Sequence, residues 1–317
     1  MFREKIKVLD CTIRDGGLIN DHFFEPEFVR AVYQALSASG VDYMEMGYRA
    51  SKKLFSPKEF GHWKFCDEEL LRKMVDGIKS GTKISVMVDV GRVFKEDIPP
   101  KKESVVDMYR VAAYIKDIDK AIDLVNHIHE KGYETTVNIM AISKALDNEL
   151  NEALQQLEKE STVPVVYIVD SYGALYSENI QFLVKKFKQY LKTKEVGIHA
   201  HNNQQLAFGN TIEAVIYDAN YIDATIYGIG RGAGNCPLEL VLGFLKNPKF
   251  NLRPILDIIS QKFLPLSREL EWGYIIPYML TGVLNEHPRA AIAMRKTEKK
   301  DNYREFYENL LAEGLTD

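Results

Sequence analysis

The segment Val196-Gly197-Ile198-His199-Ala200-His201-Asn202-Asn203 has the pattern of a β-strand that ends in polar residues. Successive side chains of a strand point to opposite faces, so His199 and His201 would share one face while Ala200 points away. Two neutral imidazoles on one element suit a divalent metal ion. The segment therefore predicts a buried strand with a metal-binding end. The alternative is one histidine packed in the core and the other exposed.

A second pair, His127 and His129, has the same spacing in a different context. It lies in Asp119–Gly132, where apolar residues recur at helical intervals. Two residues along a helix rotate the side chain by roughly 200°, so these two histidines would diverge. We therefore assign them to a helix surface and predict no metal site there.

Segments of strand character alternate with helical segments along most of the chain. The expected strands are Lys5–Arg14, Val41–Tyr48, Lys83–Val90, Val106–Ala113, Glu134–Ala141, Val163–Asp170, Glu195–His201 and Tyr221–Tyr227. The expected helices are Pro26–Ser39, Asp67–Gly77, Lys116–Lys131, Asn148–Lys159, Ser177–Leu191, Leu206–Asp218 and Leu238–Lys246. Eight strands that alternate with helical segments in about 250 residues predict an α/β fold, a (β/α)₈ TIM barrel, rather than an open doubly wound sheet. We place this catalytic domain at residues 1–250.

Residues 251–317 have a different pattern, mostly helical and interrupted by four prolines. They end in a charged run over Arg295–Glu308, which is typical of a solvated helix or a frayed tail. We predict a C-terminal helical extension that packs on the barrel.

The composition excludes several classes of protein. A net charge of −4 with both signs interspersed argues against a nucleic-acid-binding surface, which would be basic. No apolar stretch approaches the ~20 residues of a membrane span, and no signal-peptide pattern is visible. Three cysteines far apart in the sequence indicate reduced thiols. We expect a cytoplasmic protein that binds neither nucleic acid nor membrane.

Polar residues recur where the expected strands end, and these ends form the active-site face of a TIM barrel. We expect Asp15 to be the carboxylate partner of His199 and His201; a surface pair of Arg14 with Asp15 is the alternative for that dipeptide alone. Polar residues at the other strand ends are Glu45, Arg49, Asn138, Asp170, Ser171, Arg231 and Asn235.

Glu45 lies in an apolar strand, where a buried carboxylate needs a partner, and Arg14 is the obvious one. It would either take part in catalysis or orient Arg14 without touching a substrate. The glycine-rich turn Gly228–Asn235 lacks the third glycine of a dinucleotide-binding motif and the lysine of a P-loop. Its small residues would instead let Asn235 project inward as an oxygen-type metal ligand, unless the turn is only a flexible connection.

Four motifs in this order resemble the pyruvate carboxyltransferase/HMG-CoA lyase-like superfamily, the DRE-TIM metallolyases. The resemblance covers about residues 5–245 and is closest to metal-dependent aldolases of the 4-hydroxy-2-oxovalerate aldolase type. The motifs are LDCTIRDGG at Leu9–Gly17, YMEMGYR at Tyr43–Arg49, GIHAHNN at Gly197–Asn203 and GIGRGAGN at Gly228–Asn235.

The resemblance implies that a divalent ion, Mn²⁺, Mg²⁺ or Co²⁺, binds at one site. Its ligands would be Asp15, His199 and His201, with Asn235 as a further ligand. Arg14 would stabilise the enolate of a 2-oxo acid, and Glu45 would hold Arg14. We therefore predict these roles: Arg14, Glu45 and Asp170 in catalysis, and Arg14, Asn138, Ser171 and Arg231 in substrate binding.

One position departs from the resemblance. In the 4-hydroxy-2-oxovalerate aldolases a histidine soon after the RDG sequence transfers protons, whereas Leu18 stands in that place here. The nearest polar replacements are Asn20, Asp21 and His22. The general acid or base therefore has no assignment from the sequence.

The leading hypothesis is an aldolase that makes or breaks a carbon–carbon bond to a pyruvate-type 2-oxo acid through a metal-bound enolate. Its substrates would be that acid and an aldehyde. The rival hypotheses are an acetyl-CoA-dependent condensation with a 2-oxo acid and a non-catalytic barrel that binds metal and oxo acid. A homo-oligomer and a partner dehydrogenase docked on the extension are both compatible with the sequence. From that extension, Tyr278 and His287 could reach the mouth.

Overall fold

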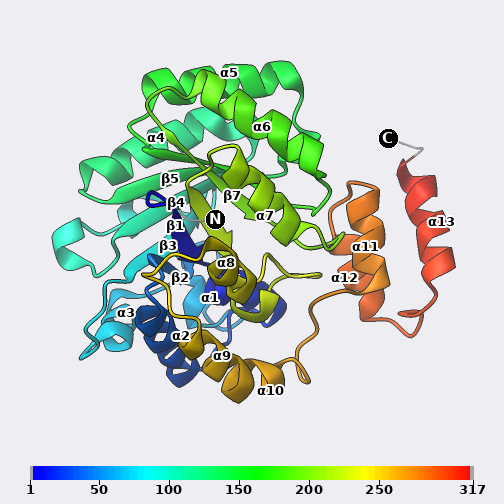
Figure 1. Cartoon of the computed structure of the whole chain (residues 1–317), viewed down its shortest axis with the longest axis horizontal. Helices are drawn as coiled ribbons and strands as arrows, with labels where there is room; N and C mark the ends of the chain where they lie inside the picture. The colour runs from blue at the N-terminus through cyan, green and yellow to red at the C-terminus, as the bar shows by residue number, and fades with distance from the viewer. Residues whose placement is uncertain (1–2, 315–317) are drawn as a thin grey trace.

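Eight parallel strands close into a barrel in which each strand pairs with its neighbours in sequence and β8 pairs with β1 (Figure 1). The computed structural model describes residues 3–314, so the outermost residues of both predicted domains lie outside the described residues. The predicted (β/α)₈ fold is confirmed. The strands are β1 Lys7–Asp10, β2 Tyr43–Tyr48, β3 Lys83–Asp89, β4 Met108–Ala113, β5 Glu134–Ile139, β6 Val165–Asp170, β7 Glu195–Ala200 and β8 Tyr221–Ala224.

Amphipathic helices surround the strands and cover the outer face of the barrel. In the first of them Pro26 occupies the first turn, where its missing N–H costs nothing, and Gly40 ends the helix with φ of 73°. Its apolar residues Val29, Val32 and Leu36 recur every three or four positions and are buried against the sheet. The helices are α2 Pro26–Ser39, α3 Glu68–Val75, α4 Ile118–Glu130, α5 Asp147–Glu160, α6 Ser177–Tyr190, α7 Ala207–Ile216 and α8 Leu238–Leu245.

Short helical turns lie in the connections, most of them 3₁₀ in type. They are η1 Gly17–Ile19, η2 His62–Lys64, η3 Lys95–Asp97, η4 Lys101–Glu103, η5 Ile115–Asp117, η6 Ile142–Lys144 and η7 Ile226–Gly228. Several of them follow a strand directly, at the face of the barrel where its strands end.

The first strand is shorter than the predicted Lys5–Arg14, and the second half of that prediction is wrong. The strand ends at Asp10, and Thr12–Gly16 form the helical turn α1. The cause is local: the Asp10 carboxylate accepts hydrogen bonds from the Thr12 amide at 3.1 Å and from its hydroxyl at 2.7 Å, which turns the chain out of the strand. On a helical turn neighbouring side chains diverge by about 100° rather than 180°, so Arg14 and Asp15 both reach the mouth.

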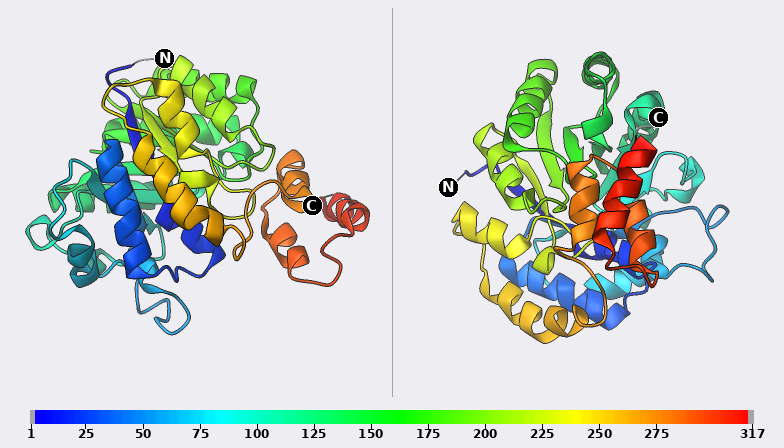
Figure 2. Two further views of the ribbon diagram at one scale, coloured as in Figure 1. Left: turned by 60° about the horizontal axis from the view of Figure 1, so that its bottom comes forward. Right: turned by 90° about the vertical axis from the view of Figure 1, so that its right-hand side faces the viewer.

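The C-terminal residues form two parts. The helices α9 Arg253–Ile258, η8 Ile259–Phe263 and α10 Leu264–Leu266 run on from the barrel, and α9 packs along α2. Three further helices, α11 Ile276–Val283, α12 Arg289–Arg295 and α13 Tyr303–Gly314, form a small cluster beside the barrel (Figure 2). This cluster has a small hydrophobic core built on Tyr278, Ala291, Phe306 and Leu310, and Ala233 of the glycine-rich turn after β8 packs into it.

Polar contacts attach α11 and the residues after it to the loops at the carboxyl ends of the strands. The Asn203 amide donates to the Tyr278 carbonyl at 3.0 Å, and the Asn285 amide donates to the Ser143 carbonyl at 3.2 Å. The helical extension therefore lies at the side of the barrel that carries the strand ends. Within residues 3–314 no helix has the length and apolar character needed to cross a bilayer.

Candidate active site

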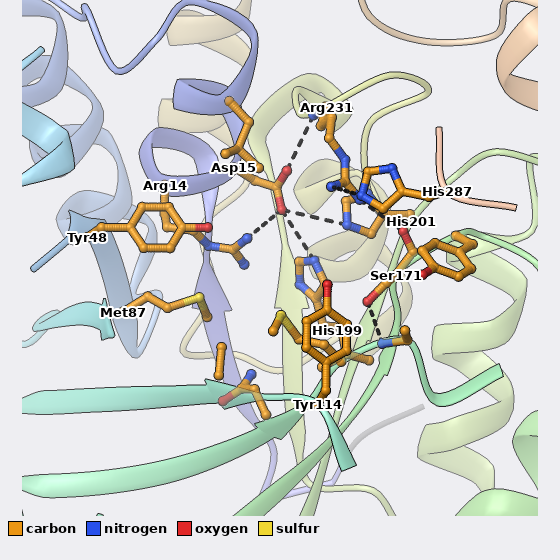
Figure 3. Close-up of a pocket in the computed structure, with 17 residues that line it drawn as sticks. Arg14, Asp15, Tyr48, Met87, Tyr114, Ser171, His199, His201, Arg231 and His287 are labelled. Atoms are coloured by element: carbon orange, nitrogen blue, oxygen red, sulfur yellow. Dashed lines mark hydrogen bonds and ion pairs between the residues drawn. The ribbon is translucent and has the colours of Figure 1, made fainter. Parts of the chain in front are cut away.

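A cavity of about 90 Å³ opens where the strands end (Figure 3). It is lined by predicted site residues from separate elements of the barrel, together with apolar and aromatic side chains that the sequence did not single out. The predicted residues in its wall are Arg14, Asp15, Asn138, Ser171, His199, His201 and Arg231.

Asp15, His199 and His201 converge in this wall, and all three are buried. One ligand atom from each lies within 4.8 Å of the others. The Asp15 Oδ2 atom is 3.3 Å from His199 Nε2 and 3.9 Å from His201 Nε2. Burial raises the pKa of Asp15, but the neighbouring Arg14 guanidinium outweighs burial and holds it well below its usual range, so the carboxylate is charged. Burial also keeps the pKa of His201 well below its usual range, so that imidazole is neutral.

His199 lies between two carboxylates. Its Nδ1 atom is 2.9 Å from Asp223 Oδ2, and its Nε2 atom faces Asp15 but has no hydrogen-bond partner among residues 3–314. Burial lowers the pKa of His199, yet the two carboxylates raise it overall because they favour a positive charge on the imidazole. With Nδ1 donating to Asp223, a metal cation at Nε2 satisfies the same demand, as in many carboxylate–histidine–metal arrangements.

Asn235 is buried close to this group. Its Nδ2 atom donates to the Ile229 carbonyl at 3.0 Å, and its Oδ1 atom is buried without a hydrogen-bond partner in the described chain. Two imidazoles, a charged carboxylate and an unpaired amide oxygen are a donor set that fits a divalent metal ion.

Beneath the cavity, buried ion pairs connect Arg14 to His199 through the barrel interior. Glu45 Oε2 accepts from Arg14 Nε at 2.7 Å and from Arg110 Nη1 at 3.1 Å. Arg110 Nη2 donates at 2.6 Å to Asp223 Oδ2, the same oxygen that faces His199. Because Arg14 Nη1 also donates to Asp15 Oδ2 at 2.7 Å, the groups form a closed ring of charges.

The sequence reasoning missed Arg110 and Asp223. The available indication was a single charged residue inside each of two otherwise apolar strands, Met108–Ala113 and Tyr221–Ala224. A charge in such a strand is costly unless it is paired, so each of them implied a partner across the barrel.

Ser171 and Arg231 belong to one wall of the cavity. The Ser171 hydroxyl accepts from the Ala141 amide at 2.8 Å, and its carbonyl accepts from Arg231 Nη2 at 3.0 Å. The Arg231 amide donates to Asp15 Oδ1 at 3.3 Å. The glycine-rich turn thus brings the Arg231 amide against Oδ1 of Asp15, whereas Arg14 contacts Oδ2 of the same carboxylate.

Asp170 does not line the cavity. Its two carboxylate oxygens accept hydrogen bonds from the amides of Ala174, at 2.9 Å, and Leu175, at 3.2 Å. Burial raises its pKa to about 6, although these hydrogen bonds act in the opposite direction. The hydrogen bonds of Asp170 therefore fix the loop that carries Ser171. Arg49, another predicted strand-end residue, also lies outside the cavity wall and forms an ion pair with Glu68 at 2.5 Å.

An Asp170→Ala variant tests what this carboxylate does. Removing it leaves two backbone N–H groups without acceptors, which should lower the free energy of unfolding by about 1–3 kcal/mol. Chemical denaturation followed by circular dichroism measures this loss. Unchanged stability together with abolished turnover would contradict the structural role and favour a catalytic one.

The residues considered from the sequence in connection with proton transfer do not all lie in the cavity wall. Leu18 lines the cavity, whereas His22 is buried against the Tyr48 ring, with ring centroids 5.4 Å apart, and is absent from the cavity wall. From the extension His287 lines the cavity, while the Tyr278 hydroxyl donates to Glu271 at 3.1 Å instead. Hydroxyl-bearing residues that the sequence reasoning missed in the wall are Tyr48, Tyr114 and Tyr172.

The second histidine pair behaves as predicted. His127 and His129 lie on α4, within Ile118–Glu130, and their side chains diverge along the helix. His129 is exposed to solvent. The strand context of His199 and His201, and not the spacing, therefore distinguishes the two pairs.

Comparisons with known proteins agree on one family. The HMGL-like family model matches residues 105–260. The 4-hydroxy-2-oxovalerate aldolase of Thermus thermophilus is 32% identical over 253 residues, covering 80% of this chain and 72% of that enzyme. The oxaloacetate decarboxylase of Mycobacterium tuberculosis is 27% identical over 245 residues, covering 77% of this chain and 70% of that enzyme. The N-terminal domain of a Bacteroides vulgatus protein, provisionally described as an aldolase, superposes with a TM-score of 0.82 at 30% identity and covers 95% of this chain and 100% of that domain.

Proposed function

The chain belongs to the HMGL-like family, and from this premise we propose that it is a divalent-metal-dependent carbon–carbon lyase acting on a pyruvate-type 2-oxo acid. The observation that carries the proposal is the convergence of Asp15, His199 and His201 in one buried wall of the cavity. The substrates are a small 2-oxo acid and, in the aldol direction, an aldehyde.

Asp15, His199 and His201 would hold the metal, and the unpaired Asn235 oxygen is the candidate for a further ligand. When bound, a divalent ion supplies a Lewis acid that polarises the substrate carbonyl. Among Mn²⁺, Mg²⁺ and Co²⁺, two imidazole ligands favour Mn²⁺ or Co²⁺ over Mg²⁺, which prefers oxygen ligands and water.

Arg14 would stabilise negative charge on the enolate. Its Nε and Nη1 atoms are held by Glu45 and Asp15, while its Nη2 atom has no partner among residues 3–314 and remains available to a substrate oxygen. A guanidinium fixed by two carboxylates needs no reorganisation when charge develops beside it, which is the condition for effective electrostatic catalysis. Glu45 acts by holding Arg14 and does not line the cavity.

Proton transfer in the aldol reaction needs a group other than Leu18. The groups in the wall that carry an exchangeable proton include Tyr48, Tyr114 and His287. Burial raises the pKa of Tyr48 and lowers that of His287 to about 4, so at neutral pH the phenol is protonated and the imidazole is neutral. Asn138 on β5 and Ser171 directly after the neighbouring β6 would orient the substrate.

Leu18 also favours a second candidate reaction, the decarboxylation of a 2-oxo diacid. In an aldol cleavage a base must remove the proton of the 4-hydroxyl group, and an alkyl side chain cannot. In a decarboxylation carbon dioxide leaves without such a base and yields the same pyruvate enolate. In both reactions Arg14 would stabilise the negative charge of the same enolate.

The location and assembly of the protein are further parts of the proposal. We place it in the cytoplasm, in keeping with three cysteines that form no disulfide. Exposed apolar side chains on the C-terminal helices and beside them, Tyr274, Val283, Tyr307 and Leu311, support a second subunit or a partner dehydrogenase docking there. Size-exclusion chromatography with light scattering decides whether the chain alone forms an oligomer.

Metal removal provides the direct test of the proposed function. Proton NMR of pyruvate in D₂O is expected to show loss of the methyl signal with Mn²⁺- or Co²⁺-loaded protein, because the enolate exchanges its carbon-bound protons with solvent. The same sample treated with EDTA should show no exchange above buffer. Exchange that continues at the same rate in EDTA, or its absence with every metal, would refute the proposal.

A further inference from the structure

Two hydrogen-bond donors face each other across one end of the cavity. His287 Nδ1 accepts from the Arg289 amide at 3.0 Å, so in the neutral imidazole the proton lies on Nε2. That Nε2 atom is 3.5 Å from Arg231 Nη1, which is always a donor. Burial and the neighbouring Arg231 lower the pKa of His287 to about 4, so the neutral form prevails at pH 7. Because both groups donate into the same space, an acceptor on a ligand placed between them would accept from both.

Arg231 is fixed in place but is not neutralised by the protein. Its Nη2 atom donates to the Ser171 carbonyl at 3.0 Å, and its Nε atom is buried without a partner. Among residues 3–314 no carboxylate forms an ion pair with Arg231, whereas Arg14 is paired with both Asp15 and Glu45. A largely enclosed guanidinium without a counter-ion, in the wall of a catalytic cavity, is suited to an anionic ligand.

The two arginines lie on opposite sides of the candidate metal ligands. Figure 3 shows Arg14 on one side of Asp15 and the histidines, and Arg231 with His287 on the other. The proposed function uses the Arg14 side for the enolate oxygen. The Arg231 side then faces the part of the substrate that lies beyond the bond to be cleaved.

We propose that Arg231 and His287 bind a second carboxylate of the substrate, which lies beyond the cleaved bond. The inference rests on the proposed function and narrows its substrate class to 2-oxo diacids. Two sources share this chemistry: a 4-hydroxy-2-oxo diacid, such as 4-hydroxy-2-oxoglutarate, and oxaloacetate.

The two sources differ in the bond-breaking step. With 4-hydroxy-2-oxoglutarate, a base takes the hydroxyl proton, the C3–C4 bond breaks, and its electron pair forms the enolate. C3 then takes up a proton to give pyruvate, and glyoxylate leaves. With oxaloacetate, the C3–C4 bond breaks, C4 leaves as carbon dioxide, and the electron pair of that bond forms the same enolate, whose C3 then takes up a proton to give pyruvate. Neither reaction needs an oxidant or a reductant.

The test compares substrates that differ in one group. 4-Hydroxy-2-oxovalerate has a methyl group where 4-hydroxy-2-oxoglutarate has the second carboxylate, and pyruvate release from both is followed by proton NMR with the Mn²⁺-loaded full chain. The unsubstituted protein should prefer the diacid in kcat/KM. In Arg231→Gln this preference should fall about 100-fold, the size of a lost charge-assisted hydrogen-bonded pair, and in His287→Gln about 10-fold. Oxaloacetate decarboxylation by the same proteins forms the third arm.

Arg289→Gln is the matched control, because it removes a positive charge next to His287 from an exposed position outside the cavity. The control should keep the preference for the diacid. An Arg231 dependence seen only with oxaloacetate supports the anion site and assigns it to decarboxylation. Equal kcat/KM for the methyl and carboxylate substrates, or a uniform loss for both in Arg231→Gln, would overturn the inference. If no substrate is turned over and pyruvate shows no exchange, the proposed function itself has failed.

Discussion

A His199→Ala variant is expected to lose metal-dependent exchange of pyruvate methyl protons by ~10³-fold or more, because losing a Lewis acid removes several kcal/mol of transition-state stabilisation. Asp15→Asn should have an effect of the same order, since it removes the one charged oxygen of the candidate donor set. The exchange rate is measured by NMR, and Mn²⁺ affinity by isothermal titration calorimetry. The exchange rate and the Mn²⁺ affinity should decrease together in each variant.

The molecule offers a matched control for this experiment in His129→Ala. This substitution also removes a histidine from a His-x-His pair, but on the exposed face of α4. It should leave Mn²⁺ affinity and exchange as they are. Full metal binding and full exchange in both His199→Ala and Asp15→Asn would remove the basis for the metal site.

Replacing Arg110 with methionine should lower the free energy of unfolding by about 3–5 kcal/mol, because it leaves the buried carboxylates of Glu45 and Asp223 without their shared cation. The same substitution should slow pyruvate exchange, because Glu45 orients Arg14 and Asp223 orients His199. Denaturant titration measures the first effect, and NMR on the folded fraction measures the second. Arg110 thus acts as a positioning residue that touches no substrate.

Arg110→Lys separates charge from geometry in this position. The ammonium group restores the positive charge, but as a single point it cannot reproduce two directed contacts to different carboxylates. Stability should recover more than the exchange rate does. If Arg110→Met keeps normal stability and exchange, the buried ring has no part in aligning the site.

The barrel and the histidine pair could be predicted from the sequence because both depend on local periodicity. A strand alternates its side chains whatever surrounds it, so His199 and His201 had to share a face. The end of β1 followed a different local rule, since the Asp10 carboxylate captures the amide and hydroxyl of Thr12 and turns the chain early. These two hydrogen bonds compete with strand formation, and the pattern of apolar residues gives no indication of them.

Other parts of the site depend on contacts between distant segments. Arg110 contacts Glu45 and Asp223 only because the barrel closes. The sequence shows that a charged residue lies in an apolar strand, but it does not show which residue pairs with it. Asp170 has the position of an active-site carboxylate, but its two oxygens are directed to the amides of its own loop. Neither fact follows from spacing along the chain.

The separate core of α11–α13 has a consequence for how this enzyme can diversify. His287 lies between α11 and α12, in a unit whose hydrophobic core is separate from the barrel core and takes only Ala233 from the barrel loops. The candidate metal ligands and Arg14 all come from the barrel, whereas His287, one of the two groups expected to choose the substrate, comes from this appended unit. Substitutions in the appended unit can therefore change substrate selectivity while the metal-binding residues of the barrel stay the same. Related proteins with the same barrel can in this way act on different substrates.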